Sequence, residues 1–385
     1  MRHLDPTDPR RIGPYTLLGR LGAGGMGTVY LGRSAGGRTV AVKVIRPELA
    51  DDERFRARFR GEVAAARTVS GAFTAPVVDA DPDGPQPWMA TAFVPGLSLH
   101  RAVDAHGPLP EAALGTLAAG IAEALVGIHA AGLVHRDLKP ANVLLAADGP
   151  HVIDFGISRA ADGTALTATG VVVGSPGFLA PEQALDEAVT PATDVFALGA
   201  TLVYAAGGRG AFGEGPAHAL LFRVVNSAPD LSAVPAALRE VVAGCLEKRP
   251  EQRPTPRQVI AAIEQTAPAA TSGSWLPAPL MADVLAAAQL VTGAPTPPAP
   301  PAPTPTPQAA PAPTPPAAPT PPTGTTPAGT APTADDGSDR TVLLGRATDS
   351  TGPGPTGPSR RRLLLGLAGG AVAVAGGAVA AVLEP

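Results

Sequence analysis

Residues 135–156 of this chain read HRDLKPANVLLAADGPHVIDFG, and this segment is the most informative part of the sequence. It carries two acids and an amide at fixed distances, since Asn142 follows Asp137 by five residues and Asp154 follows Asn142 by twelve. Apolar residues on either side of an Ala-Asp-Gly-Pro turn predict two short strands that form a hairpin. We therefore expect the loop and the hairpin to aim Asp137, Asn142 and Asp154 at one point.

This stretch resembles the catalytic loop and the metal-binding triplet of protein kinases, which read H-R-D, an Asn five residues after the Asp, and then D-F-G. The resemblance implies that Asp137 accepts the proton of the substrate hydroxyl and that Lys139 lies near the transferred phosphate. It also implies that Asn142 and Asp154 hold Mg²⁺, or Mn²⁺, with the hard oxygen ligands that such ions prefer. The bland alternative is a polar hairpin with capping aspartates, but other parts of the kinase pattern recur at the right distances.

A glycine-rich segment, Gly22 to Gly27, lies between strands predicted over Tyr15 to Leu21 and Thr28 to Gly32. Glycines let backbone N–H groups approach a phosphate closely because no Cβ intervenes. The G-x-G-x-x-G spacing also occurs in dinucleotide-binding units, but there the glycines lead into a helix. Here Val29-Tyr30-Leu31 continues as a strand, which favours the kinase hairpin.

The resemblance also implies an ATP site. Its residues would be Leu21, Gly22, Ala23, Gly24, Gly25, Met26, Gly27, Val29, Ala41, Lys43, Thr91, Phe93 and Val94. Lys43 belongs to a strand predicted over 39–45, and Glu62, on a helix predicted from about Asp52, is the candidate to pair with it and hold it against the phosphates. An exposed strand lysine and a surface glutamate are the ordinary alternatives. Residues 92–95 would form the hinge whose backbone meets the adenine, although Ala92 stands where an acidic residue is often found.

Three further residues match positions that stabilise the kinase fold. The resemblance implies a buried ion pair between Glu182, in Ala180-Pro181-Glu182, and Arg253, and it implies that Asp194 braces the catalytic loop. These residues would be structural and not catalytic.

The segment between the D-F-G and A-P-E triplets would be the activation loop. We expect phosphorylation at Thr167 or Thr169, with Arg136 pairing with the phosphate and ordering the segment. Hydroxyls in a loop can also be without function, so the two sites are hypotheses.

Composition bounds the rest of the chain. The 46 Pro and 45 Gly in 385 residues are too many for compact cores throughout, and the net charge of −4 gives no basic field that would indicate a nucleic acid partner. The single cysteine, Cys245, excludes an internal disulfide and is expected to be a small buried hydrophobic residue.

The chain changes character after Thr266. Residues 267–359 are predicted to be a Pro/Ala/Thr-rich disordered linker, within which Leu276 to Val291 form a brief helix of no assigned role. Residues 360–362 are arginines, and the 21 uncharged residues of 363–383 are long enough for one transmembrane helix. Arginines on the N-terminal flank predict that the kinase domain stays in the cytoplasm, at the cell membrane. Small residues recur every four positions from Gly369, which allows two such helices, and so a homodimer, to approach closely.

The sequence thus predicts an α+β, two-lobe protein-kinase fold. The expected parts are a flexible leader (1–13), a kinase domain (14–266), the linker and the membrane helix. The domain would consist of a small β-rich lobe with one helix (14–93) and a larger, mainly helical lobe (94–266). The G-x-G-G-M-G and A-P-E-Q forms resemble bacterial eukaryotic-type (Hanks-type) serine/threonine kinases, which transfer phosphate from Mg-ATP to proteins. A pseudokinase scaffold at the membrane and a small-molecule phosphotransferase are the alternatives.

Overall fold

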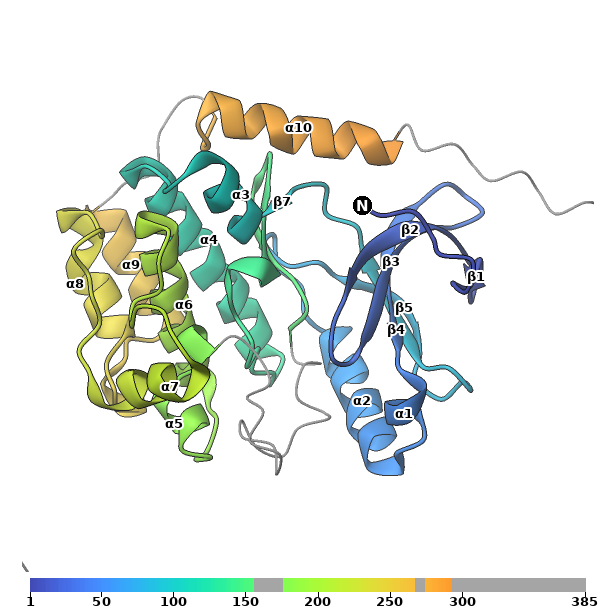
Figure 1. Ribbon diagram of the computed structural model, residues 1–385, viewed down its shortest axis with the longest axis horizontal. Helices are drawn as coiled ribbons and strands as arrows, with labels where there is room; N and C mark the ends of the chain where they lie inside the picture. The colour runs from blue at the N-terminus through green and yellow to red at the C-terminus, as the bar shows by residue number, and fades with distance from the viewer. Residues whose placement is uncertain (156–175, 267–273, 293–385) are drawn as a thin grey trace, which may run out of the picture. The chain divides into compact units, whose positions relative to one another are not determined.

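The computed structural model describes residues 1–155, 176–266 and 274–292 (Figure 1). The chain divides into two units, residues 1–304 and residues 305–385, and all of the second unit lies outside the described ranges. The predicted phosphorylation sites Thr167 and Thr169, and the predicted membrane helix 363–383, also lie outside the described residues.

The small lobe is built on a six-stranded sheet in the order β1-β2-β3-β4-β6-β5, in which neighbouring strands are antiparallel. Its strands are β1 (Arg11–Ile12), β2 (Tyr15–Ala23), β3 (Gly27–Arg33), β4 (Thr39–Ile45), β5 (Val77–Asp81) and β6 (Trp88–Ala92). Alternation explains the packing of β4, because Val40, Val42 and Val44 are buried on one face together with Tyr15 and Leu17. The predicted strand–glycine–strand hairpin is therefore present as β2 and β3.

Helix α2 (Glu53–Ala66) follows the short helix α1 (Pro47–Ala50) and packs against the sheet. Asp52 caps α2, since its carboxylate accepts the backbone N–H groups of Arg54 and Phe55. Phe55, Phe59 and Val63 of α2 form a core with Ile45 of β4 and Met89 of β6.

Residues 1–13, which we expected to form a flexible leader, make defined contacts with the small lobe. Residues 11 and 12 pair with β2 as β1, and the Asp8 carboxylate is buried, where it accepts hydrogen bonds from the Arg20 guanidinium and the Tyr30 hydroxyl. The Arg20 hydrogen bonds lower the pKa of Asp8 to about 2, in spite of its burial. A polar segment was predicted to be flexible because the sequence does not show which partners its charges meet.

The large lobe is mainly helical. Its helices are α3 (Leu99–His106), α4 (Glu111–Ala130), α5 (Pro181–Ala184), α6 (Pro191–Gly207), α7 (Ala217–Asn226), α8 (Ala236–Cys245), α9 (Pro256–Thr266) and α10 (Ala278–Thr292), with short 3-10 turns η1 (Pro140–Asn142), η2 (Pro176–Phe178) and η3 (Pro250–Gln252). Helices α4 and α6 are apolar nearly all round because both are buried in the core of the lobe. Among the described residues, α4 alone is long and apolar enough to cross a membrane, but 61% of its most apolar window is buried inside the lobe.

A three-stranded sheet in the order β7-β8-β9 lies at the start of the large lobe. Its strands are β7 (Leu97–Ser98), β8 (Val143–Ala146) and β9 (Gly149–Val152). The predicted hairpin is present, but its turn is shorter than expected, because Gly149 and Pro150 already pair with β8.

Residues 274–292 correct the predicted boundary of the linker. Helix α10 packs against α3 and β7, and Leu276, Leu280 and Val284 belong to the core of the large lobe (Figure 1). The composition of this part of the chain conceals its packing, because Leu276, Leu280 and Val284 stand among Ala, Pro and further apolar residues, and only their spacing of four places them on one face.

Cys245 is fully buried at the end of α8, as expected, and burial raises the pKa of its thiol to about 12. Because the thiolate is the reactive form, we expect native protein to react with an aromatic disulfide reagent at least about 10³-fold more slowly than unfolded protein. Absorbance of the released thiolate measures both rates. Rapid labelling of native protein at pH 8 would contradict the burial of this side chain.

Candidate active site

Strand register brings the predicted nucleotide-binding side chains onto one face of the sheet. Lys43 lies opposite Val29 on β3 and Met89 on β6, and Ala41 lies opposite Thr91. Directly opposed residues, and residues two apart on a strand, share a face, so Val29, Ala41, Lys43 and Thr91 point the same way. Helix α2, which carries Glu62, packs on this face through its contacts with Met89.

The glycine-rich segment connects β2 to β3 beside that face. A Cβ at Gly27 would lie 1.9 Å from the Val44 carbonyl oxygen, so only glycine fits the close pairing of β3 with β4. A Cβ at Gly22, Gly24 or Gly25 would meet nothing within 4 Å. The backbone of these three residues is therefore open to a ligand.

The catalytic loop holds Asp137, Lys139 and Asn142 in direct contact. The Lys139 ammonium donates to both carboxylate oxygens of Asp137, at 2.9 and 2.7 Å. The Asn142 amide donates to the Asp137 backbone oxygen at 2.8 Å and to its carboxylate at 3.2 Å. These contacts fix the orientation of the Asp137 carboxylate, as a general base requires.

Asp194 holds the backbone of this loop from the start of α6. Its fully buried carboxylate accepts the backbone N–H groups of His135, at 2.8 Å, and Arg136, at 2.9 Å, and lies 2.7 Å from His129 Nε2. Arg136 has a left-handed backbone with φ of 67°, a strained conformation for a residue other than glycine. Gln183 donates to the Arg136 backbone oxygen at 2.9 Å, so the strained peptide is held from both sides.

Glu182 and Arg253 form the ion pair that the resemblance implies. The Arg253 guanidinium binds both oxygens of the carboxylate, at 2.7 and 2.8 Å, and the Thr193 hydroxyl donates to one of them. Burial acts to raise the pKa of Glu182, but the hydrogen bonds from Arg253 and Thr193 outweigh it and lower the pKa. The pair fastens the A-P-E segment to the turn before α9.

Lys43 pairs with a different acid from the one predicted. Its Nζ lies 3.5 Å from Asp154 Oδ1, and among the described residues no ion pair joins Lys43 to Glu62. Glu62 Oε2 is buried without a hydrogen-bond partner. The expected Lys43–Glu62 ion pair is therefore absent from this conformation.

Burial raises the pKa of Glu62 to about 7, against the attraction of Arg136, Arg58 and Lys43. A carboxyl whose pKa rises on folding binds more protons in the folded state, so stability falls as the pH rises from 4.5 to about 7. We expect Glu62→Gln to raise the free energy of unfolding at pH 8 by about 1–2 kcal/mol, after a discount for partial exposure. The gain should shrink as the pH falls towards 4.5, which urea titration at several pH values would measure.

Glu53→Gln is the matched control for this prediction, because Glu53 is exposed on the same helix. It should not raise stability at any pH, because loss of its charge from the first turn of α2 costs about 0.3–1 kcal/mol. An equal gain in stability for Glu62→Gln at pH 5 and pH 8 would show that the charge on the buried Glu62 carboxylate does not destabilise the protein.

The donor set of Asn142 and Asp154 fits Mg²⁺. This ion is commonly held by one or two protein oxygen ligands, with water and substrate phosphate completing its shell. Asp154, with φ of 59°, is also held in a left-handed conformation, the kind of strain that recurs at functional sites. No cluster of three or more His, Cys, Asp or Glu able to hold a metal occurs within residues 1–155, 176–266 and 274–292.

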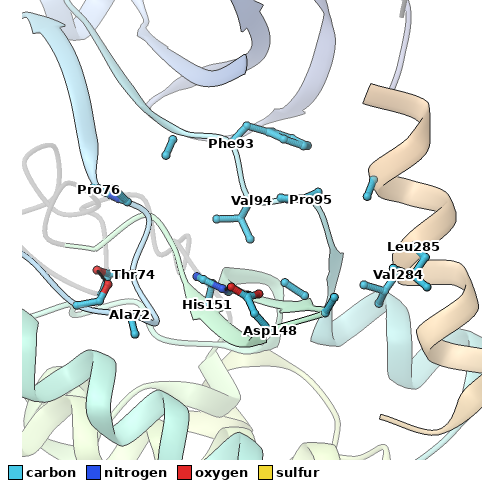
Figure 2. A pocket seen from close by; sticks show the side chains of 15 residues that line it. Ala72, Thr74, Pro76, Phe93, Val94, Pro95, Asp148, His151, Val284 and Leu285 are labelled. Atoms are coloured by element: carbon cyan, nitrogen blue, oxygen red, sulfur yellow. Dashed lines mark hydrogen bonds and ion pairs between the residues drawn. The ribbon is translucent and has the colours of Figure 1, made fainter. Parts of the chain in front are cut away.

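A cavity of about 520 Å³ adjoins the hinge but is not this site (Figure 2). It is lined by hinge residues that include Phe93 and Val94, by the β8–β9 turn and by α10. It includes none of Lys43, Asp137, Asn142 or Asp154. The candidate catalytic and metal-binding residues therefore lie outside this cavity.

Sequence reasoning missed two residues that hold the catalytic loop. Gln183 holds Arg136, and His129 contacts Asp194 from α4. The position of Gln183 next to Glu182 offered a signal, but the contact of His129 crosses 65 residues and has no local pattern.

The structure thus has two lobes, with a lysine-bearing sheet, a hinge and a loop that presents an oriented aspartate, which is the arrangement of a protein kinase domain. The chain belongs to the protein kinase domain family, which matches residues 15–262.

Relatives with this domain occur in several bacteria. The chain is 49% identical over 297 residues to the probable serine/threonine-protein kinase PkwA of Thermomonospora curvata, covering 77% of this chain and 39% of that protein. It is 52% identical over 281 residues to the serine/threonine-protein kinase AfsK of Streptomyces coelicolor, covering 70% of this chain and 35% of that protein. The chain thus spans less than two fifths of the length of these relatives. The 297-residue match, wherever it begins in a chain of 385 residues, includes residues 274–292.

Among solved structures, the fold is similar to the crystal structure of the Mycobacterium tuberculosis PknI kinase domain. The TM-score is 0.54 at 28% identity, over 67% of this chain and 97% of that chain. The two-lobe kinase fold expected from the sequence is therefore confirmed.

Proposed function

We propose that this protein is a serine/threonine kinase that transfers the γ-phosphate of Mg-ATP to hydroxyl groups of proteins. The proposal rests on the orientation of the Asp137 carboxylate. Lys139 and Asn142 hold this residue by hydrogen bonds, and the preceding residue, Arg136, has a strained backbone. Asp137 takes the proton of the attacking hydroxyl, the hydroxyl oxygen bonds to the γ-phosphorus, and the bond to the leaving ADP oxygen breaks. A bound Mg²⁺ would supply neutralisation of the phosphate charge.

The other site residues have roles in positioning. Lys43 would bind the α- and β-phosphates once Glu62 replaces Asp154 as its partner, and this exchange frees Asp154 for the metal. Backbone N–H groups of the glycine-rich segment would approach the phosphates, and the hinge backbone at Phe93 and Val94 would meet the adenine. The change of partner by Lys43 is thus the step that would convert the conformation described here into an active one.

The proposal extends to regulation and location. Phosphorylation of Thr167 or Thr169 in trans would activate the enzyme, and residues 363–383 would tether it to the cytoplasmic face of the cell membrane as a single-pass protein, with homodimers as one arrangement. The presence of Lys43, Asp137 and Asp154 argues against a pseudokinase scaffold.

Phosphate incorporation from labelled Mg-ATP tests the proposal. Full-length protein is incubated alone and with a generic basic protein substrate, and labelled residues are identified by mass spectrometry. Phosphoserine and phosphothreonine, with Thr167 or Thr169 among the labelled sites, are the expected products. Nucleotide binding without any label would support the scaffold instead.

A further inference from the structure

Residues 274–292 lie outside the kinase family match yet are seated in the large lobe by apolar contacts. Leu276 precedes α10, and Leu280 and Val284 follow on it at intervals of four, which places them on one face. Their exposed fractions are 3%, 2% and 1%, and they belong to the same core as Leu99 and Leu145. These three side chains are nearly as deeply buried as apolar residues of α4 such as Leu117 and Ile121.

Two polar contacts fix this segment at separate points. The indole N–H of Trp275 donates to the backbone oxygen of Ala146, the last residue of β8, at 2.9 Å. Further along, Asp283 of α10 lies 2.9 Å from His106 Nε2, in the last turn of α3. These two contacts therefore define the position of the segment on the lobe, in addition to its apolar packing.

The elements that it holds lead directly into the nucleotide and metal positions. The hinge ends in β7, which pairs with β8 through Leu97 and Leu145. A Cβ at Gly96 would lie 2.4 Å from the Leu145 carbonyl oxygen, so the end of the hinge rests on the β8 backbone. The hairpin of β8 and β9 in turn connects Asn142 to Asp154.

A cavity lies beside the hinge. Val284 and Leu285 of α10 face Phe93, Val94 and Pro95 across the 520 Å³ cavity (Figure 2). The segment thus contacts β7, which follows the hinge, and the hinge residues before β7 line the cavity.

We propose that residues 274–292 form a hinge brace that holds β7 and the β8–β9 hairpin in the arrangement that binds nucleotide. Trp275, His106 and Asp283 are positioning residues of this brace. If only a fraction of the molecules has the arrangement that binds nucleotide, the apparent Kd equals the intrinsic Kd divided by that fraction. Variants that weaken the contacts of the brace lower this fraction and therefore raise Kd. The inference rests on the proposed binding of ATP at this hinge.

The test uses the full-length protein with Val284→Asp, which places a charge in the buried face. Ala286→Asp is the matched control, since it adds the same charge at an exposed position of the same helix. Calorimetry at low temperature gives Kd for Mg-ATP on folded protein, and hydrogen exchange follows residues 93–98 and 143–152. We expect Kd to rise about fivefold to tenfold in Val284→Asp, with faster exchange in both segments and no change in the control.

Trp275→Phe keeps an aromatic ring but removes the N–H donor, and it serves if Val284→Asp does not fold. It should raise Kd about twofold to threefold, with faster exchange at the β8–β9 turn. An unchanged Kd, with faster exchange confined to residues 274–292, would overturn the brace, as would wild-type protein that binds no Mg-ATP. Wild-type protein that binds Mg-ATP in a brace-dependent manner but incorporates no phosphate would refute the proposed kinase activity and leave the brace standing.

Discussion

Asp137→Asn is expected to lower kcat for phosphate transfer by about 10³-fold, within the range that general-base catalysis contributes. The amide keeps the shape of the side chain but cannot accept the hydroxyl proton, and it no longer neutralises Lys139, whose ammonium contacts both carboxylate oxygens. Nucleotide affinity should change little, because the side chain lies on the catalytic loop and not on the sheet face that carries Lys43. Initial rates with a protein substrate, together with Kd for Mg-ATP, measure the two effects separately.

Asp186→Asn is the matched control. Asp186 is exposed in the same lobe, and its φ of 58° is a conformation that asparagine adopts readily. The control should retain wild-type kcat. If Asp137→Asn also retains most of its activity, Asp137 is not the base and the proposed mechanism fails.

Arg253→Ala is expected to lower the free energy of unfolding by about 3–5 kcal/mol, the usual cost of removing one member of a buried ion pair. The guanidinium binds Glu182, donates to the backbone oxygens of Ala192, Glu247 and Lys248, and lies 5.0 Å from the centre of the Phe196 ring. Its loss therefore leaves a buried carboxylate and three carbonyl groups without this donor. Urea or thermal unfolding measures the effect.

The effect of Arg253→Ala should depend on pH. A carboxyl whose pKa is lowered by folding stabilises the protein above its unfolded pKa, and that contribution is lost as the pH falls through the lower, folded value. The difference between wild type and Arg253→Ala should thus be largest near neutral pH and shrink in acid.

Arg257→Ala is the control for this second prediction, since Arg257 is exposed on α9. It should change stability by less than about 0.5 kcal/mol. A loss for Arg253→Ala as small as that of the control would show that the pair contributes little to stability.

The sequence alone determined the features that have local patterns. The spacing of Asp137, Asn142 and Asp154 identified the loop and the hairpin, and the strand after Gly27 distinguished the kinase hairpin from a dinucleotide-binding unit. These predictions succeeded because the hydrogen bonds of a hairpin, and the close approach that only glycine permits, depend on residues that are near one another in the chain.

The tertiary structure alone decided which distant groups meet. The partner of Lys43 in this conformation depends on where α2 lies, and Asp8 is buried because Arg20 and Tyr30 approach it across the sheet. The role of residues 274–292 likewise follows from contacts with Ala146 and His106, more than a hundred residues earlier in the chain. Such contacts leave no periodic trace in the sequence, because their energy comes from burial and pairing between segments that only the folded chain brings together.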